Sequence, residues 1–301
     1  MNKRYTAVLL SFLFLPLLLH ARSEATFDRT LSVSGAVNLD LTTGSGDISV
    51  KTGASNQVIV HGRVHSNNWV FGDSGAVQQV ESNPPIQQSG NSIRIGYNLA
   101  EDVKRRVSID YEVTVPVNTT LDAHSGSGNI EVAGVRSDAQ AQTGSGDIRV
   151  RDLGGRVHLQ TGSGNIRAEN SAAPFYAHTG SGDIEAALSG PGDVDVHTGS
   201  GTIQVRGIRG GILAHTGSGN IEADGDVTGS WELHSGSGNI RLAFGSNSNF
   251  NLDVHTGSGS IHSDLPITVQ GSLGNRSLKG AVRGGGPNVQ VSTGSGDIDI
   301  R

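Results

Sequence analysis

Apolar and polar residues alternate in short stretches along most of the chain, and these stretches come in pairs around a recurring turn. Val157 and Leu159 precede one such turn with His158 between them, and Ile166 and Ala168 follow it. Alternation with a period of two over four to six residues is typical of a β-strand with one buried face. Many repeats end in a single further apolar residue (Val135, Leu153, Ile208, Val227). Each repeat is therefore predicted to contain two short strands and a shorter third edge.

The recurring turn is the hexapeptide Thr/Ser-Gly-Ser-Gly-Asp/Asn-Ile, here called the motif, with occasional replacements at its fifth position. Its ten copies begin at Thr43, Ser125, Thr143, Thr161, Thr179, Thr198, Thr216, Ser235, Thr256 and Thr293. From Ser125 to Ser235 the copies lie 18 or 19 residues apart, and steps of 21 and 37 follow. A fixed period of this length indicates repeats that stack on their neighbours. The prediction is an all-β fold, a parallel β-solenoid of about ten coils of 18–19 residues that is right-handed by default, with one motif lost in the last step.

The glycines of the motif are predicted to be structural. They would allow a positive φ at a sharp corner, where a Cβ would collide with the adjacent coil. These turn glycines are Gly144, Gly146, Gly162, Gly164, Gly180, Gly182, Gly199, Gly201, Gly217 and Gly219. The Asp or Asn that follows can accept from turn amides or form an in-register ladder. Calcium is the rival interpretation, but each coil has one such position, and it is often Asn, Thr202 or Ser260 instead of an acid. Neutral ligands at so many sites make a weak cage for a hard cation.

Between Val50 and Leu121 the motif is absent, and the sequence predicts an amino-terminal cap. One short helix is expected from Ser74 to Glu81, before Pro84-Pro85, and strands at 92–95 and 107–115. The predicted organisation is a signal peptide over 1–25, the β-rich cap and first coil or coils over 26–120 with at most one helix, and a continuous repeat region over 121–301. At the carboxyl end, Ile298 and Ile300 read as inward residues of an uncapped final coil. Such an open edge favours end-to-end self-association.

The first residues predict export. Lys3 and Arg4 precede an apolar run over 7–19, and cleavage after Ser23 or after Ala25 fits equally well. The run is shorter than the roughly 20 residues of a membrane span, so no transmembrane segment is expected after cleavage. The chain lacks cysteine, which excludes disulfides. Its net charge of -6 comes without a basic stripe, so nucleic acid is not an expected partner. The expected location is the periplasm, the outer envelope or the medium.

The most unusual surface feature is a set of histidines immediately before the motif, at positions that point outward by parity. They are His124, His178, His197, His215, His234 and His255, with Gln142 and Gln160 in two other coils. His197, His215, His234 and His255 are predicted to lie in consecutive coils. Two residues earlier stand Asp122, Asp195, Glu232 and Asp253. Three interpretations stay open: a stacked polar ladder, a ligand-binding face, and a site for a borderline divalent metal. No serine is marked as a nucleophile because every motif serine is repeated. No catalytic residue and no cofactor are therefore expected.

The chain resembles a family of bacterial exported proteins known as “putative adhesins”, which contain a domain of unknown function. The resemblance rests on the motif, on the segment from Val107 to Pro116, and on the closing segment from Gly284 to Ile298. It implies a β-solenoid at the cell envelope and carries over no catalytic residues. The expected function is a non-enzymatic binding or adhesion scaffold whose partner is an unidentified envelope polymer or protein. A carbohydrate-active enzyme on the same fold is the first alternative, and a metal-binding periplasmic protein is the second.

Overall fold

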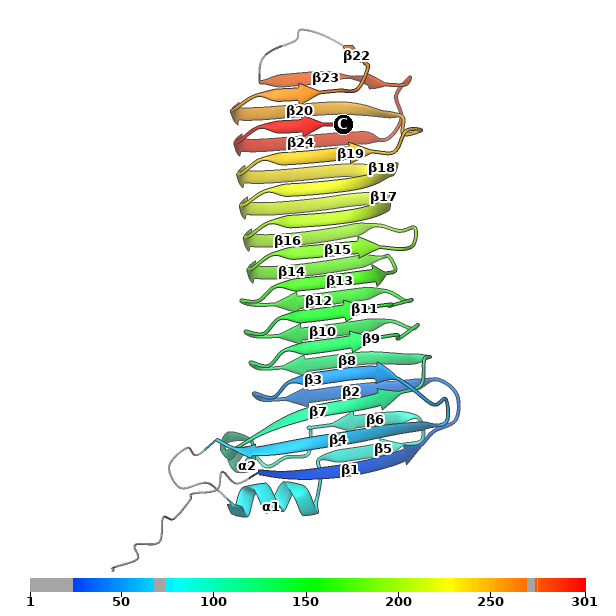
Figure 1. Ribbon diagram of the computed structural model, residues 1–301, viewed down its shortest axis with the longest axis vertical. Helices are drawn as coiled ribbons and strands as arrows, with labels where there is room; N and C mark the ends of the chain where they lie inside the picture. The colour runs from blue at the N-terminus through cyan, green and yellow to red at the C-terminus, as the bar shows by residue number, and fades with distance from the viewer. Residues whose placement is uncertain (1–23, 68–73, 270–273, 275) are drawn as a thin grey trace, which may run out of the picture.

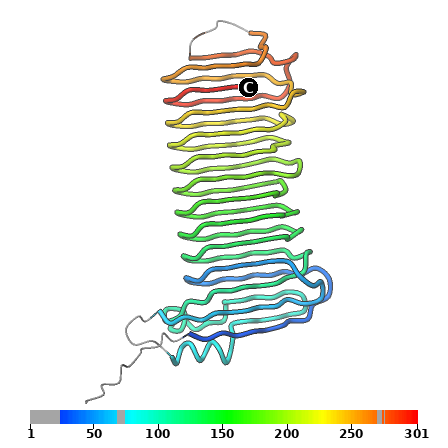
Figure 2. The backbone as a smooth tube through the Cα atoms, in the orientation of Figure 1, coloured from blue at the N-terminus to red at the C-terminus, as the bar shows by residue number. Residues whose placement is uncertain are grey.

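The computed structural model describes residues 24–67, 74–269, 274 and 276–301 (Figure 1). The predicted signal peptide lies outside these residues, apart from Glu24 and Ala25, which begin strand β1 (Glu24–Ser32). The described chain is built almost entirely of β-strands, stacked as successive coils of similar width (Figure 2). No helix in this part of the chain is long and apolar enough to cross a membrane.

Two sheets of mainly parallel strands run along the stack, one on each side of the motif corner. The first sheet holds the strands that precede the motif: β2 (Val37–Thr43), β8 (Thr119–Ser125), β10 (Ala139–Thr143), β12 (Val157–Thr161), β14 (Phe175–Ser181), β16 (Val194–Ser200), β24 (Asn288–Ser295) and β20 (Phe250–Ser258). The second sheet holds the strands that follow it: β3 (Ile48–Thr52), β9 (Ile130–Ala133), β11 (Ile148–Arg151), β13 (Ile166–Ser171), β15 (Ile184–Leu188), β19 (Ile240–Phe244), β25 (Ile298–Ile300) and β21 (Ile261–Ser263). The long strands β17 (Ile203–Ser218) and β18 (Ile221–Ser237) contribute to both sheets.

The alternating pattern of the sequence sets the register between coils. Equivalent residues pair with one another, as Val157 does with Phe175 and Ile166 with Ile184. The inward residues form a cluster of buried side chains that extends from Phe27 to Ile300. The single apolar residues that were predicted to close the coils, such as Val135 and Leu153, are buried in it as well. Because each coil covers the apolar face of the next, burial of this core is shared along the whole stack.

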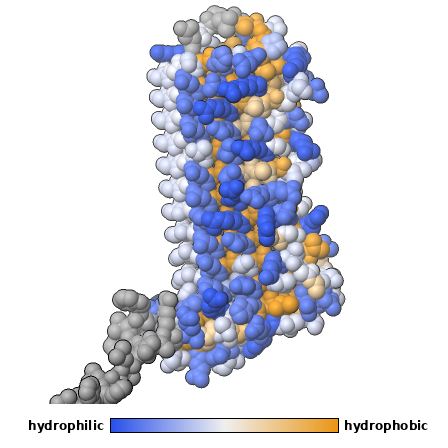
Figure 3. Space-filling view, in the orientation of Figure 1, coloured by the Kyte–Doolittle hydropathy of each residue, from blue (hydrophilic) through white to orange (hydrophobic). Residues whose placement is uncertain are grey.

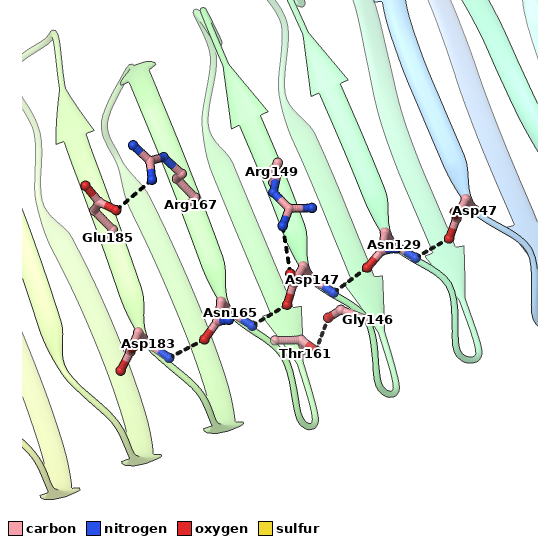
Figure 4. A network of polar contacts seen from close by, with 10 residues as sticks. All are labelled: Asp47, Asn129, Gly146, Asp147, Arg149, Thr161, Asn165, Arg167, Asp183 and Glu185. Carbon is pink, nitrogen blue, oxygen red and sulfur yellow. Dashed lines mark hydrogen bonds and ion pairs between the residues drawn. The ribbon is translucent and has the colours of Figure 1, made fainter.

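The motif corner is held by two repeating hydrogen bonds between coils (Figure 4). The buried Thr161 hydroxyl donates to the carbonyl oxygen of Gly146 at 2.8 Å. The backbone N–H of Asn165 donates to Oδ1 of Asp147 at 2.9 Å, and the amide oxygen of Asn165 in turn accepts from the N–H of Asp183 at 2.9 Å. The predicted Asp/Asn ladder is therefore confirmed. Along the rod, the small residues of this corner form a pale edge in the hydropathy view (Figure 3).

The glycines of the corner are required for close approach rather than, in most cases, for a left-handed backbone. A Cβ at Gly164 would lie 2.0 Å from the carbonyl oxygen of Gly146, and one at Gly162 would lie 2.4 Å from that of Gly144. Among the ten predicted turn glycines only Gly182 and Gly219 have φ in the left-handed range, at +157° and +155°. The predicted collision with the adjacent coil is confirmed, and the predicted general need for positive φ is wrong.

The cap at the amino end interrupts the coils in sequence but not in space. Strands β2 and β3 stack directly on β8 and β9, although the cap residues lie between them in the chain. The cap contains β1, β4 (Gln57–Ser66), β5 (Ile86–Ser89), β6 (Ser92–Ile95) and β7 (Val107–Val115). Strand β7 extends the second sheet by pairing with β3 in parallel, and β4 and β1 follow in antiparallel orientation. The predicted strands at 92–95 and 107–115 are confirmed.

Two helices accompany the cap, where the sequence predicted at most one. Helix α1 (Ser74–Ser82) confirms the predicted helix and packs against β1 and β4. The second helix, α2 (Glu101–Arg106), contradicts the prediction. Its ends carry complementary charges: Lys104 contacts Glu101 at 2.9 Å and Arg106 contacts Asp102 at 2.8 Å. Pairs three and four residues apart on a helix stabilise short helices without an apolar stripe, so hydrophobic periodicity could not reveal this one.

The coils at the carboxyl end do not stack in the order of the sequence. The coil of β24 and β25 lies between the coil of β18 and β19 and that of β20 and β21 (Figure 1). Strand β23 (Ser277–Val282) then covers β20 in antiparallel orientation and also pairs with β22 (Ile267–Val269). The predicted uncapped final coil containing Ile298 and Ile300 is thus wrong, because that coil is interior. The 37-residue step holds this covering hairpin rather than a coil that lost its motif.

Candidate functional site

Four of the predicted histidines form a continuous row on the outer face of the first sheet. The histidine row consists of His178, His197, His215 and His234, one from each of four adjacent coils. Their ring centroids are separated by 6.1, 5.9 and 4.8 Å in that order. His255 was predicted to continue the row, but Ser292 of the intercalated coil stands between it and His234. His124 is separated from the row by Gln142 and Gln160.

The acid two residues before each histidine contacts it in two coils of the four. Oδ1 of Asp122 lies 2.7 Å from Nε2 of His124, and Oδ1 of Asp195 lies 2.6 Å from Nε2 of His197. Both carboxylate oxygens are buried. Because neither contact is aligned as a hydrogen bond, both oxygens lack a hydrogen-bond donor.

The other two predicted pairs have different partners or neighbours. Asp253 binds Lys279 at 3.0 Å. His234 contacts the hydroxyl of Ser292 at 2.8 Å through its Nδ1. The acid-x-His pattern therefore does not form one repeating unit along the sheet.

The environment favours the neutral imidazole at two positions of the first sheet, His215 and His158. Burial lowers the pKa of His215, and the neighbouring His234 and His197 lower it further, whereas Glu232 opposes the shift. Burial also lowers the pKa of His158, against the influence of Asp122. Across the described parts of the chain, no group of three His, Cys, Asp or Glu side chains is arranged to hold a metal ion. The geometry therefore gives the metal interpretation of the histidine row no support.

Beside the histidine row, a groove of about 510 Å³ crosses the first sheet over β12, β14, β16, β17 and β18. This cavity is called the face groove. Its lining includes Arg156, His158, Tyr176, Asp195, Leu213 and Glu232. Each of these except Arg156 occupies the outward position two residues before the histidine or glutamine of its coil. The groove therefore follows the long axis of the rod, from one coil to the next.

An aromatic stack forms part of the groove. The rings of His158 and Tyr176 lie with centroids 4.3 Å apart and planes inclined by 25°. Since His158 belongs to the coil on one side of Tyr176, the opposite ring face is directed toward the next coil, where the shorter Asp195 pairs with Tyr176. One coil further, Leu213 is 37% exposed. The groove therefore combines a half-buried aromatic ring and an exposed aliphatic side chain with carboxylates.

Tyr176 was not among the predicted site residues, although the alternating pattern places its side chain on the outer face. Phe175 and Ala177 are inward residues, so the aromatic side chain between them had to face outward. Leu213 stands in the same way between the inward Ile212 and Ala214. Large apolar residues at outward positions break the alternating pattern, and two of them in nearby coils indicate a binding surface.

The outer face of the second sheet is different in character. Arg167 contacts Glu185 at 3.2 Å and Arg241 contacts Glu222 at 3.0 Å, both between adjacent coils. Arg149 lies opposite Glu131 in the ladder and contacts Asp147 at 2.8 Å. Exposed pairs of this kind contribute only about 0–1 kcal/mol each. This face is a balanced, solvated surface, which leaves the first sheet as the candidate site.

Residues 38–301 match the family model described as Toastrack DUF4097. No curated protein matches the chain. Among solved structures, a “putative adhesin” from Bacteroides fragilis NCTC 9343 shares 12% identity at a TM-score of 0.39, covering 92% of this chain and 97% of that chain. A “putative adhesin” from Parabacteroides distasonis ATCC 8503 shares 12% identity at 0.37, covering 92% and 97%. A “putative lipid binding protein” from the same organism shares 11% at 0.27, covering 92% and 96%. Similarity this low says nothing about what this chain binds.

Proposed function

This chain belongs to the Toastrack DUF4097 family, and from that premise we propose that it is an exported, non-enzymatic β-solenoid that binds a polymer or protein of the cell envelope. The membership agrees with the resemblance indicated by the motif. The proposal includes the finer points that the sequence predicted, namely about ten coils of 18–19 residues and a right-handed path. The binding surface is the outer face of the first sheet, formed by the face groove and the histidine row.

One observation carries this proposal: the face groove lies on a rigid sheet. Its outward side chains are fixed by strands that pair on both sides with in-register neighbours. A preformed surface loses little conformational entropy when a ligand binds. At about 510 Å³ it falls within the usual range of ligand cavities, roughly 300–1,000 Å³. Apolar surface with a few convergent polar groups is the composition of such sites.

The proposal is tested by binding of residues 24–301 to isolated bacterial cell envelopes. We expect fluorescently labelled protein to sediment with the envelopes. The double substitution Tyr176→Ala/Leu213→Ala, which removes the apolar part of the groove, should weaken binding about tenfold. The matched control is Gln204→Ala on the second sheet, which should bind like the wild type. Equal binding by all three proteins would overturn the proposed site.

The alternative of a carbohydrate-active enzyme draws on the groove carboxylates. One of them, Asp193, is engaged in the fold because its Oδ1 accepts the N–H of Gly211 at 2.9 Å. A glycosidase would need two carboxyl groups placed on either side of the scissile bond. The same envelope incubations decide the matter, because release of soluble saccharides that the groove variant fails to release would overturn the non-enzymatic proposal.

A further inference from the structure

We propose that the face groove is a binding site for a linear, uncharged polysaccharide, an inference that rests on the proposed binding function and specifies its ligand. The ligand would lie along the rod axis, across the coils of β12, β14, β16, β17 and β18. Adjacent strands in a sheet are about 4.8 Å apart, so these coils offer a repeating series of contacts to an extended chain. The groove is open to solvent, so the bound segment can belong to a longer polymer.

The apolar part of the groove suits the carbon–hydrogen faces of sugar rings. One face of Tyr176 is occupied by His158 at a centroid distance of 4.3 Å. The other face is directed toward the coil of Asp195, whose side chain is shorter. A flat ring can stack there, with Leu213 providing further apolar contact one coil away. Burial of such surface supplies the main favourable term in binding.

The polar part of the groove suits hydroxyl groups, because the groove presents both donors and acceptors. Asp195 and Glu232 are acceptors, whereas Arg156 and Ser230 can donate. A hydroxyl both donates and accepts, so a sugar can match the whole set. An ammonium group would satisfy only the acceptors.

The charge of the groove argues against an acidic polymer. Asp193, Asp195 and Glu232 contribute three carboxylates, and Arg156 is the single permanent cation among the described lining residues. Burial lowers the pKa of His158, which favours its uncharged form. A phosphate- or uronate-bearing chain would be repelled by the resulting excess of negative charge. Together with the mixed hydrogen-bonding set, this leaves an uncharged saccharide as the ligand that the groove fits.

The test is isothermal titration calorimetry of residues 24–301 with three uncharged hexasaccharides: β-1,4-linked glucose, mannose and N-acetylglucosamine. Hexalysine and hexagalacturonate are the charged comparisons. We expect at least one uncharged hexasaccharide to bind more tightly than either charged hexamer. Tyr176→Ala should weaken it about tenfold, equivalent to about 1.4 kcal/mol, whereas Tyr176→Phe, which keeps the ring, should stay within about twofold. Tyr97→Ala, at a tyrosine of the cap that is 36% exposed, is the matched control and should bind like the wild type.

The outcomes separate this inference from the general binding function. Binding to envelopes without binding to any uncharged hexasaccharide would overturn the saccharide inference alone. Tighter binding of hexalysine would replace it with a basic protein partner. Equal affinities of the wild type and a correctly folded Tyr176→Ala protein would show that the saccharide binds elsewhere. Absence of binding to envelopes, by contrast, would overturn the proposed function.

Discussion

Replacing Gly164 with alanine tests the packing of the motif corner directly. The added Cβ would lie 2.0 Å from the carbonyl oxygen of Gly146, whereas real Cβ contacts essentially never fall below 3.0 Å. The two coils must therefore separate by about 1 Å at this corner. That carbonyl also accepts the hydroxyl of Thr161, which is 1% exposed. The substitution consequently disturbs a buried hydrogen bond as well as the spacing of the coils.

The expected cost follows from the bonds that the separation breaks. Leaving the buried Thr161 hydroxyl unsatisfied costs about 1–3 kcal/mol. Loss of the bond from the Asn165 N–H to Asp147 adds about 1 kcal/mol. We therefore expect Gly164→Ala to lower the free energy of unfolding by about 3 kcal/mol. For a chain of this size the melting temperature should fall by roughly 6–12 °C.

The assay is urea and thermal unfolding followed by circular dichroism at about 218 nm, a wavelength typical of β-sheet. The matched control is Ser163→Ala, one residue earlier in the same corner, where the side chain is exposed. Exposed substitutions of that kind usually change stability by less than about 0.5 kcal/mol. If Gly164→Ala and Ser163→Ala unfold within about 0.5 kcal/mol of each other, the close approach of the coils does not limit this position.

Three further predictions concern pH, the ladder and the intercalated coil. Because the pKa values of His215 and His158 are lowered in the fold, the unfolded chain binds more protons below about pH 6.5, and the melting temperature should fall as the pH drops from 7.5 to 5.5. The double substitution His158→Gln/His215→Gln should reduce that fall, and an unchanged fall would show that these two histidines do not cause it. Asn165→Ala leaves the N–H of Asp183 without its acceptor and should cost about 1 kcal/mol in urea unfolding; a cost near zero would mean that water replaces the amide. Deleting residues 288–301 exposes the facing edges of β18, β19, β20 and β21, so amide hydrogen exchange should accelerate in these strands and stay slow in β10–β14; uniform protection would contradict the observed coil order.

Local sequence was sufficient to predict the individual coil. Alternation identified inward residues such as Val157 and Leu159, which are fully buried, and the motif marked the corner with its Asp/Asn ladder. These features depend only on contacts between equivalent residues of adjacent coils. Since such contacts recur with the repeat, the pattern of one coil is confirmed by the pattern of the next.

The order of the coils could not be predicted in the same way. The motif copies at Thr256 and Thr293 are nearly identical, so either coil could stack on that of Ser235 by its own sequence. The covering strand β23 pairs with β20. Because of that pairing, the strand that lies next to β18 is β24 rather than β20. The prediction that His255 follows His234 failed for this reason.

Only part of the face groove could be predicted from the sequence. Parity placed His215 and Asp195 on the correct face and could have placed Tyr176 there as well. The depth of the groove depends on which coils are neighbours and on the short side chain of Asp195 beside a large ring. Such differences in side-chain size between coils become visible only once the register is known.

The path of the chain also makes the length of the rod adjustable. In the middle of the stack, neighbouring coils are 18 or 19 residues apart in sequence. At the two ends the corresponding separations are 82 and 58 residues. Short loops close at lower entropic cost than long ones, so the middle coils can form first and the ends afterwards. A coil inserted or deleted between β10 and β16 would leave both covered ends unchanged. The length of the rod can therefore change during evolution in steps of one coil, about 4.8 Å, without altering the structures that cover its two ends.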